Sequence, residues 1–535
     1  MTYLKKHVSK SNIPQSKPLF PTQVKNEAGG YVFQVSELEQ LKRFLIIGTS
    51  GGTYYANERK ITTDNIRNIE RLLDKNGIEA IQLAVEISQA GRAPKNDQAI
   101  LLLAIASTHK NPLVRKAAYE AVPLVCRIGT HLYQFVDFRK ELDGGWGSGM
   151  KNCISNWFND KTAKDVAYQV AKYKNRESWA ARDLLRLSHP KAASKEHDAV
   201  YKWVTSNGVE VKEGLPNFLS ICNEVKEIGN KEKIGKRDLN KIVKYITENN
   251  LPREVLPTGV LGEKEIWQAL IPGMGATALV RNLGKMSSIN LLATGSEETR
   301  AVCKKLTDIE FLKKGRVHPI NLLAAKLTYE QGRGDKGSLT WNVNETVSSA
   351  LEDAFYLSFG TVEPTNKNTM IALDVSGSMG FSVGFGKLTA AMVSSVMAMT
   401  TLRTETYNSF IMGFASQFKD LGINKNMSLN EVLKRVVMNN FGSTDCSIPM
   451  TWAEKEGIKL DAIICYTDNE TWVGRIHPYQ ALRNYQKKFG LNTKLITVAT
   501  TAARSSIGDK TDPNCLDLVG FDSATPQLIS EFIKD

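Results

Sequence analysis

Residues 369–379 read TMIALDVSGSM, and this stretch decides the fold class of the last third of the chain. Its first seven residues form a short, nearly continuous apolar run, which is typical of a strand buried on both faces of a parallel sheet. The run ends in small polar residues that place Asp374, Ser376 and Ser378 at alternate positions of a chain leaving a strand. We therefore expect these three side chains to point to the same side.

The residues after this stretch alternate between strand and helix patterns. Apolar runs predict strands at 407–414, 461–467, 494–500 and 516–521. Helical patterns separate them at 388–402, 429–437, 478–488 and 526–533. This alternation predicts an α/β domain with a parallel sheet covered by helices on both faces. Ligands of such sheets bind at the carboxyl ends of the strands, where the polar residues of the opening stretch lie.

The chain before residue 364 has a different, almost entirely helical pattern, with few convincing strands. Helical periodicity is found at 97–107, 113–126, 162–174, 179–188, 196–205, 237–249, 263–271, 275–285, 296–305 and 319–330. Successive helical hairpins without an obvious repeat favour a degenerate α-solenoid of the HEAT type. An irregular helical domain has the same periodicity and remains the alternative. We predict three regions: a basic N-terminal arm (1–30), a helical region (31–363) and the α/β domain (364–535).

The charge of the chain is concentrated in the helical part. The 535 residues include 69 Lys and Arg against 56 Asp and Glu, a net charge of +13. Residues 366–535 hold 17 basic and 16 acidic residues, which leaves 52 basic and 40 acidic residues, a net +12, before them. Such an excess predicts a polyanionic partner, most simply nucleic acid, bound by the helical region.

Several classes of protein are disfavoured. No uninterrupted apolar run approaches the roughly 20 residues of a membrane helix. Residues 1–30 are polar, with five lysines before Glu27 and no apolar segment of a secretion signal; they predict a disordered or loosely docked arm, or one that contacts phosphates. The seven cysteines are scattered and include no C-x-x-C, which favours reduced thiols in the cytoplasm over disulfides or a zinc site.

The polar residues after the strands form a candidate metal site. Asp374, Ser376 and Ser378 follow the first strand, Thr444 lies in the loop before a helix, and Asp468 ends the strand 461–467. Parallel strands would bring these groups to one crevice. Hydroxyl and carboxylate oxygens suit a small divalent cation such as Mg²⁺ or Mn²⁺.

Two other readings of this site remain open. The first is a vestigial site that binds no metal. The second is a catalytic magnesium site, but the motifs show no paired nucleophile and general base, and the chain contains no GxxxxGK[ST] phosphate loop. Glu470 and His477 lie nearby in sequence and are more typical of loop and helix-start residues than of an acid/base pair.

Basic residues of the helical region form the candidate nucleic-acid surface. Arg182, Arg186 and His189 follow one another at i, i+4 and i+7, on a stripe facing away from Leu184, Leu185 and Leu187. With Tyr173 and Trp179 nearby, this stripe suits phosphate contact and base stacking. A solvated helix face is the alternative for any single residue. Further candidates are Lys172, Lys174, Arg176, Arg281 and Lys285, and another basic set includes Arg115, Lys116, Arg127, Arg139 and Lys140.

The metal-site residues resemble the metal-ion-dependent adhesion site of von Willebrand factor A domains. The whole chain resembles the TROVE-module family of Ro RNA-binding proteins, its bacterial members above all. The matching stretches run in the same order: 30–35, 43–45, 51–55, 172–174, 183–189, 281–286, 315–319, 374–379, 444–446, 467–470 with Trp472, and 520–522. Ser443 stands where the family pattern leads us to expect glycine, which leaves the threonine ligand in place.

The resemblance implies a fold, partners and roles for single residues. The fold would be a monomeric ring of HEAT-like repeats closed by a von Willebrand A domain. Small structured Y RNA would bind the outer basic surface, at Lys172, Lys174, Arg182, Arg186 and His189, and single-stranded 3′ ends of misfolded or immature RNA would enter a central hole. The protein would act as a scaffold without catalysis, beside an exoribonuclease such as polynucleotide phosphorylase. Ser376, Ser378 and Thr444 would bind the cation directly, with Asp374 and Asp468 supporting.

Two alternative functions stay open beside this one. One is a protein-adhesion scaffold in which the metal captures an acidic residue of a partner and the basic ring is incidental. The other is a metal-dependent hydrolase or chelatase-like ATPase subunit, for which the sequence supplies no catalytic groups.

Overall fold

The structure is a computed structural model that describes residues 11–49, 56, 58–208, 211, 213–335, 337–405, 408–439 and 442–535. The segment Gly51 to Tyr55, one of the stretches behind the family resemblance, lies outside these residues.

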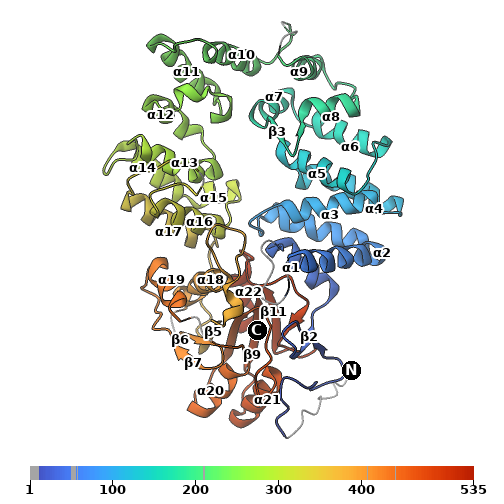
Figure 1. Ribbon diagram of the computed structural model, residues 1–535, viewed down its shortest axis with the longest axis vertical. Helices are drawn as coiled ribbons and strands as arrows, with labels where there is room; N and C mark the ends of the chain where they lie inside the picture. Colours follow the sequence, from blue (N-terminus) through green and yellow to red (C-terminus); the bar gives the residue numbers. More distant parts are fainter. Residues whose placement is uncertain are drawn as a thin grey trace.

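The helical region begins at α1 and ends at α17 (Figure 1). Its first half comprises α1 (Glu37–Ile47), α2 (Glu58–Ala90), α3 (Asp97–Thr108), α4 (Pro112–Val125), α5 (Gly129–Glu141), α6 (Ser148–Asn159), α7 (Ala163–Lys172), α8 (Ala181–Ser188) and α9 (Lys195–Thr205). Its second half comprises α10 (Asn217–Gly229), α11 (Lys236–Asn249), η1 (Arg253–Val255), η2 (Thr258–Val260), α12 (Lys264–Gly273), α13 (Ala276–Ser288), α14 (Glu297–Leu306), α15 (Ile309–Gly315), α16 (Pro319–Glu330) and α17 (Glu345–Leu357). All the helices predicted from periodicity are present, with ends shifted by a few residues.

Local sequence explains many of the helix ends. Asn111 caps α4 by accepting a hydrogen bond from the amide of Leu113, and Pro112 occupies its first turn. Ser178 does not cap the helix that follows it. Ser178 has a φ of +67° in the tight turn between β3 (Asn175–Arg176) and β4 (Trp179–Ala180), and α8 begins after Ala180. This hairpin lacks the alternating pattern of a strand, so periodicity did not reveal it.

The C-terminal domain is built on a six-stranded sheet in the order β11-β9-β8-β5-β6-β7, parallel except for the edge strand β7. The strands are β5 (Thr369–Asp374), β6 (Ser409–Phe414), β7 (Phe418–Asp420), β8 (Ala462–Thr467), β9 (Lys494–Ala499) and β11 (Cys515–Val519). The helices are η3 (Gly377–Gly380), α18 (Ala390–Thr404), α19 (Leu429–Val437), α20 (Ile448–Glu456), α21 (Pro478–Phe489) and α22 (Thr525–Lys534). Sequence patterning missed β7, and it gave no bounds for α20, the helix expected after Thr444.

Both faces of this sheet are covered, as the apolar runs predicted. Ile371 and Leu373 of β5 belong to one hydrophobic cluster, which includes residues of α18 and α22. Met370 and Ala372 belong to a second cluster with residues of α20 and α21. Alternate residues of a strand point to opposite faces, so a strand covered on both sides must be apolar throughout.

The helical region leaves the C-terminal domain at one end and returns to it at the other, which makes a ring (Figure 1). At the first end, the buried Arg43 of α1 donates to the carbonyls of Ala503 and Ser505. At the other end, Glu352 of α17 accepts a hydrogen bond from the amide of Leu429, at 3.0 Å. The C-terminal domain thus closes the ring, as the family resemblance implied.

A cluster at Arg92 joins three separate parts of this ring. The Arg92 guanidinium, just after α2, binds the Asp522 carboxylate at 2.6 Å, and the Arg92 carbonyl accepts a hydrogen bond from His318 Nε2 at 3.1 Å. Asp522 lies in the C-terminal domain and His318 caps α16. Burial lowers the pKa of His318 to about 4, so this imidazole is neutral at neutral pH and adds no positive charge beside Asp522.

The N-terminal residues that the structure describes lie against the C-terminal domain. The strands β1 (Val24–Lys25) and β2 (Tyr31–Gln34) pair, and β2 also pairs with β10 (Ser505–Ser506). The few short strands before residue 360 were not expected from sequence. Residues 11–30 are therefore docked rather than loose.

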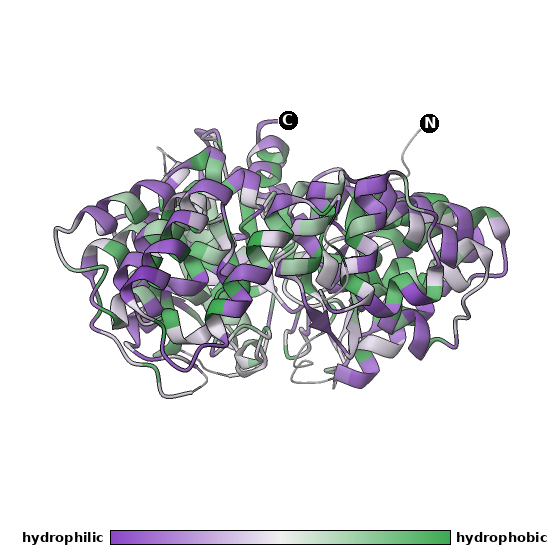
Figure 2. Ribbon diagram, turned by 90° about the horizontal axis from the view of Figure 1, so that it is seen from above, coloured by the Kyte–Doolittle hydropathy of each residue, from purple (hydrophilic) through white to green (hydrophobic). Residues whose placement is uncertain are grey.

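The helices of the molecule are amphipathic. Figure 2 shows hydrophilic and hydrophobic residues alternating along them. Among the described residues, no helix combines the length and the apolar character needed to span a bilayer.

Candidate metal centre and nucleic-acid interface

The predicted metal-site residues meet at the carboxyl ends of β5 and β8, which are neighbours in the sheet. Asp374 ends β5, and Ser376 and Ser378 follow it into η3. Asp468 comes directly after β8, and Thr444 lies in the loop before α20. All five side chains are buried, with Ser378 the most exposed at 4%. The fold therefore gathers residues that are up to 94 positions apart (468 − 374 = 94) in one crevice.

A chain of hydrogen bonds connects four of these residues. Asp374 Oδ1 accepts from the amide and the hydroxyl of Ser376, at 3.0 and 2.6 Å. The Ser376 hydroxyl lies 2.9 Å from that of Ser378 and accepts from the Thr444 hydroxyl at 2.9 Å. Three hydroxyl oxygens thus lie around one point, with a carboxylate behind them, as a small hard cation requires.

Sequence reasoning missed one member of the site, Thr467. Its hydroxyl donates to Asp374 Oδ2 at 2.7 Å, so both oxygens of Asp374 are held. The only signal in the sequence was that Thr467 is the last residue of an otherwise apolar strand. A threonine is common in strands, so this signal could not single it out.

The electrostatics of the site favour a cation. Burial, and then the charge of Asp468, raises the pKa of Asp374 to about 7. Burial also raises the pKa of Asp468, whose Oδ2 is buried without a hydrogen-bond partner among the described residues. Two buried carboxylates and an unpartnered oxygen are costly unless a positive charge compensates them. The residues present therefore fit a divalent cation.

This centre differs from the common metal sites of His, Cys and acidic residues. Within the described part of the chain, no three His, Cys, Asp or Glu side chains are grouped so as to hold a metal ion. The candidate ligands here are mainly hydroxyls, which suit Mg²⁺ or Mn²⁺ better than zinc.

Exposed apolar side chains lie close to this centre in sequence. Trp472 and Val473, shortly after Asp468, are 40% and 37% exposed, and Met438, shortly before Thr444, is 84% exposed. The amide of Trp472 donates to the Thr444 carbonyl at 3.2 Å, which joins the two loops.

The basic stripe of α8 is exposed as predicted. Arg186 and His189 are exposed, and Arg182 is half-buried. The guanidiniums lean toward the turn after α9, where Arg182 donates to Asn207 Oδ1 at 3.3 Å and Arg186 to the Thr205 carbonyl at 3.1 Å. Both contacts are to neutral groups, so the two charges are available to an anion. The expectation that Leu187 faces inward was wrong, since it is 38% exposed.

The remaining candidate RNA residues fall into two further groups. Lys174 and Arg176 are exposed, next to the β3–β4 hairpin, and Arg176 pairs with Glu177 at 3.4 Å. Lys172 is half-buried, with its ammonium 5.2 and 5.4 Å from the ring centres of Tyr168 and Tyr173. It lines a small cavity together with Arg253 and Asn282.

Arg281 and Lys285 of α13 line a larger cavity of about 750 Å³, which also includes Arg253 and Asn282. Lys172 and α13 are therefore near one another through the segment 250–254, although they are more than a hundred positions apart in sequence. This proximity could not be read from the sequence.

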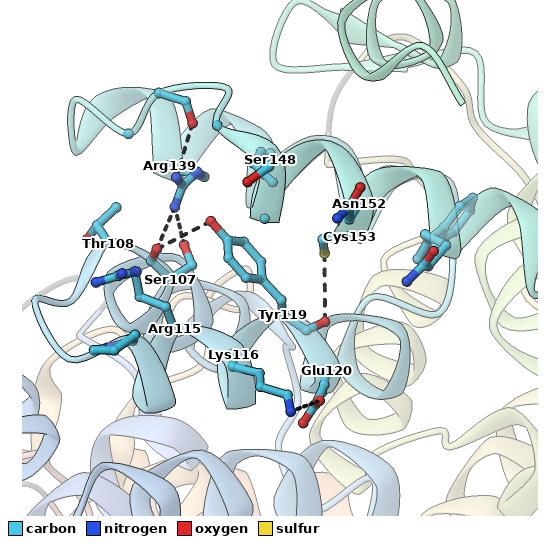
Figure 3. Close-up of a pocket in the computed structure, with 18 of the residues that line it drawn as sticks. Ser107, Thr108, Arg115, Lys116, Tyr119, Glu120, Arg139, Ser148, Asn152 and Cys153 are labelled. Atoms are coloured by element: carbon cyan, nitrogen blue, oxygen red, sulfur yellow. Dashed lines mark hydrogen bonds and ion pairs between the residues drawn. The ribbon is translucent and has the colours of Figure 1, made fainter. Parts of the chain in front are cut away.

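The other basic set is only partly available to a ligand. Arg115, Lys116 and Arg139 line a cavity of about 1110 Å³, in which the Tyr119 ring points toward Ser107 (Figure 3). Arg139 is 7% exposed and donates to the Ser107 carbonyl and hydroxyl, at 2.9 and 2.6 Å, and to the Gly145 carbonyl. It therefore ties α5 to α3 and the glycine-rich loop before α6, which is a structural role.

Comparisons with known proteins match this architecture. The TROVE domain matches residues 24–241 and 248–328, and the Ro60 vWA domain matches residues 368–533. The RNA-binding protein RO60 of Deinococcus radiodurans is 38% identical over 538 residues, covering 100% of this chain and 99% of that protein. The protein of the same name from Caenorhabditis elegans is 35% identical over 584 residues, covering 96% and 90%.

A solved structure agrees with these matches. The crystal structure of the Deinococcus radiodurans Ro (Rsr) protein superimposes with a TM-score of 0.68 at 37% identity, covering 93% of this chain and 99% of that one. The match confirms the fold class predicted from sequence.

Proposed function

The chain belongs to the Ro60 family of TROVE-domain proteins, and from that membership we propose that it is an RNA-binding scaffold. Its outer basic surface binds a small structured Y RNA, and its ring receives the single-stranded 3′ ends of misfolded or immature RNA. The observation that carries this proposal is the stripe of Arg182, Arg186 and His189, in which two guanidinium charges on one helix face have no acidic partner among the residues that the structure describes. Backbone phosphates are the natural ligand for such a stripe.

The role in the cell follows from the same chemistry. A basic surface binds phosphates without choosing a sequence, so a partner must supply the chemistry that acts on the RNA. We propose that an exoribonuclease such as polynucleotide phosphorylase is that partner, that the protein itself is a monomeric non-enzyme, and that it works in the cytoplasm. The seven cysteines, all unpaired in the structure, suit a reducing compartment.

Salt dependence tests this proposal directly. The affinity for a fluorescently labelled structured RNA with a free 3′ tail should fall by at least ~10³-fold between 50 and 200 mM salt, because several phosphate contacts release counterions. Fluorescence anisotropy measures it. An affinity that does not change with salt would show that the basic surface does not contact phosphates.

We also propose that the crevice at β5 and β8 binds Mg²⁺ or Mn²⁺. Ser376, Ser378 and Thr444 would be direct ligands, and Asp374 and Asp468 would support them. The bound ion would offer an open position to a carboxylate oxygen. What supports the proposal is the convergence of three hydroxyls with two buried carboxylates, one of which has an unpartnered oxygen.

Removing the central hydroxyl should weaken cation binding. Ser376 contacts Asp374, Ser378 and Thr444, so Ser376→Ala removes one ligand and the hydrogen bond that orients the others. We expect Mn²⁺ to bind at least ~10-fold more weakly, as measured by the electron paramagnetic resonance of free Mn²⁺. Ser382→Ala, an exposed serine a few residues later, is the matched control. Equal affinity of Ser376→Ala and wild type would refute this ligand set.

A second candidate function, a metal-dependent protein-adhesion scaffold, is favoured by the exposed Trp472 and Val473 beside Asp468. An acidic partner side chain could reach the ion while its apolar neighbours cover these residues. Adhesion would be the main function if a protein partner dissociates when the metal is chelated and the chain shows no affinity for RNA.

A further inference from the structure

We infer that the N-terminal arm, residues 11–30, is a structural part of the metal centre, and that Gln15 positions the two loops that carry its ligands. The inference rests on the proposed metal site. The arm lies more than 400 positions in sequence from the loops that it contacts, and it supplies none of the proposed metal ligands.

Gln15 joins the two ligand loops through one fully buried amide. Its Nε2 donates to Asp445 Oδ1 at 2.8 Å, and Asp445 is the neighbour of Thr444. Its Oε1 accepts from the Thr471 hydroxyl at 2.6 Å, and Thr471 lies three residues after Asp468. The same side chain therefore sets the separation between the loop of Thr444 and the loop of Asp468.

Further hydrogen bonds close this arrangement around Gln15. Its Nε2 also donates to the Ile476 carbonyl at 2.9 Å, and its backbone N–H donates to the Gly474 carbonyl at 3.0 Å. The Thr471 hydroxyl in turn accepts from the amide of Cys446 at 3.0 Å. Every polar atom of the Gln15 side chain is used, so no shorter or apolar residue can replace it without leaving buried groups unpaired.

A second part of the arm holds the residues directly after Asp468. Asn26 Nδ2 donates to the carbonyls of Asn469 and Thr471, at 3.1 and 2.9 Å. The amide of Ala28 donates to the Glu470 carboxylate at 2.9 Å. Asn469 has a φ of +64°, in the left-handed region that asparagine tolerates better than most residues.

The backbone of the arm at Gly30 also packs closely against the backbone of this loop. A Cβ at Gly30 would lie 1.9 Å from the Thr471 carbonyl oxygen and 2.9 Å from Trp472 Cα. Only glycine permits this approach, so the arm fixes the backbone of the loop sterically as well as by hydrogen bonds.

This arrangement makes arm docking and cation binding linked equilibria. The hydroxyl and carboxylate ligands bind a cation well only if their loops are held at the right separation, which is what outer partners of metal ligands do. A cation that tightens the loops must in return tighten the docking of the arm, because the coupling free energy is the same in both directions.

A matched pair of substitutions in the full chain tests the inference. Gln15→Met keeps the length of the side chain and removes its hydrogen bonds. Gln23→Met makes the same change at a second buried glutamine of the arm, whose Oε1 accepts from the amides of Leu19 and Phe20 within the arm. We expect Gln15→Met to bind Mn²⁺ about 10-fold more weakly and Gln23→Met to bind it as wild type does.

Two further readouts test the inference, the first of them without a bound cation. In EDTA, the amides of residues 469–476 should exchange hydrogen faster in Gln15→Met than in Gln23→Met. In wild type, saturating Mn²⁺ should slow proteolytic cleavage of the arm. The inference would be overturned, and the proposed metal site left standing, by either of two results. One is equal Mn²⁺ affinity of Gln15→Met and wild type, and the other is arm cleavage in wild type that Mn²⁺ does not affect. A wild-type chain that does not bind Mn²⁺ would overturn the proposed metal site and the inference with it.

Discussion

Reversing two charges on α8, in Arg182→Glu/Arg186→Glu, is expected to weaken the binding of a structured RNA by at least ~100-fold at physiological salt. Each reversal removes a phosphate contact and adds a repulsive charge. The slope of log affinity against log salt should also fall by about two, because about two fewer counterions are released. Fluorescence anisotropy over a salt series gives both quantities.

The structure indicates that this change acts on binding and not on folding. Arg186 is exposed and Arg182 half-buried, and their contacts to Asn207 and Thr205 are surface hydrogen bonds. The control is Lys455→Glu/Lys459→Glu, which reverses two exposed charges of the C-terminal domain. If both double variants lose equal affinity, the effect is one of net charge alone, and the α8 stripe is not the RNA surface.

The same variant identifies the RNA in the native host. Crosslinking and sequencing of RNA bound to wild type should recover a small structured RNA and precursor 3′ ends. The α8 variant should lose the small RNA. If neither protein recovers RNA above background, the stripe is only a solvated surface, and the metal centre with its protein partner becomes the functional site.

Removing Arg92 is expected to have the largest effect on stability, about 3–5 kcal/mol. Its guanidinium makes a two-pronged contact with Asp522, whose side chain is only 1% exposed. Arg92→Ala leaves this carboxylate buried and unpaired, and the neutral His318 beside it cannot compensate. Because Arg92 joins the start of the helical region, α16 and the C-terminal domain, the ring should open at this point. Thermal or urea unfolding measures the loss.

An exposed ion pair nearby provides the comparison. Arg71 of α2 pairs with Glu37 at 3.1 Å, but 47% of its side chain is exposed. Arg71→Ala should therefore cost no more than about 1 kcal/mol. Arg92→Lys keeps the charge and loses the two-pronged contact, so its loss of stability should lie between those of Arg71→Ala and Arg92→Ala. If Arg92→Ala and Arg71→Ala are equally stable, the Arg92 cluster does not hold the ring closed.

Local patterns predicted the elements well where a segment is long and periodic. Apolar spacing predicted the parallel strands of the C-terminal sheet and the helices α3, α4, α7 to α9, α11 to α14 and α16, since burial on one face or two dictates that spacing. It did not predict α5, α6, α10 and α15. Other exceptions have local reasons. The hairpin β3–β4 and the strand β7 are too short to show a period, and Leu187 is an apolar residue left on the surface of α8.

The chain by itself determined the fold class and the nearest residues of the proposed metal site. Asp374, Ser376 and Ser378 share a side because two-residue spacing at a strand end puts them there, and the parallel order brings Thr444 and Asp468 to the same edge. Only the tertiary structure decided which distant residues complete that site. Gln15 is 430 positions from Asp445, and a single buried glutamine has no period or spacing that would reveal its partners. Such contacts depend on how whole elements pack, and local sequence does not encode that packing residue by residue.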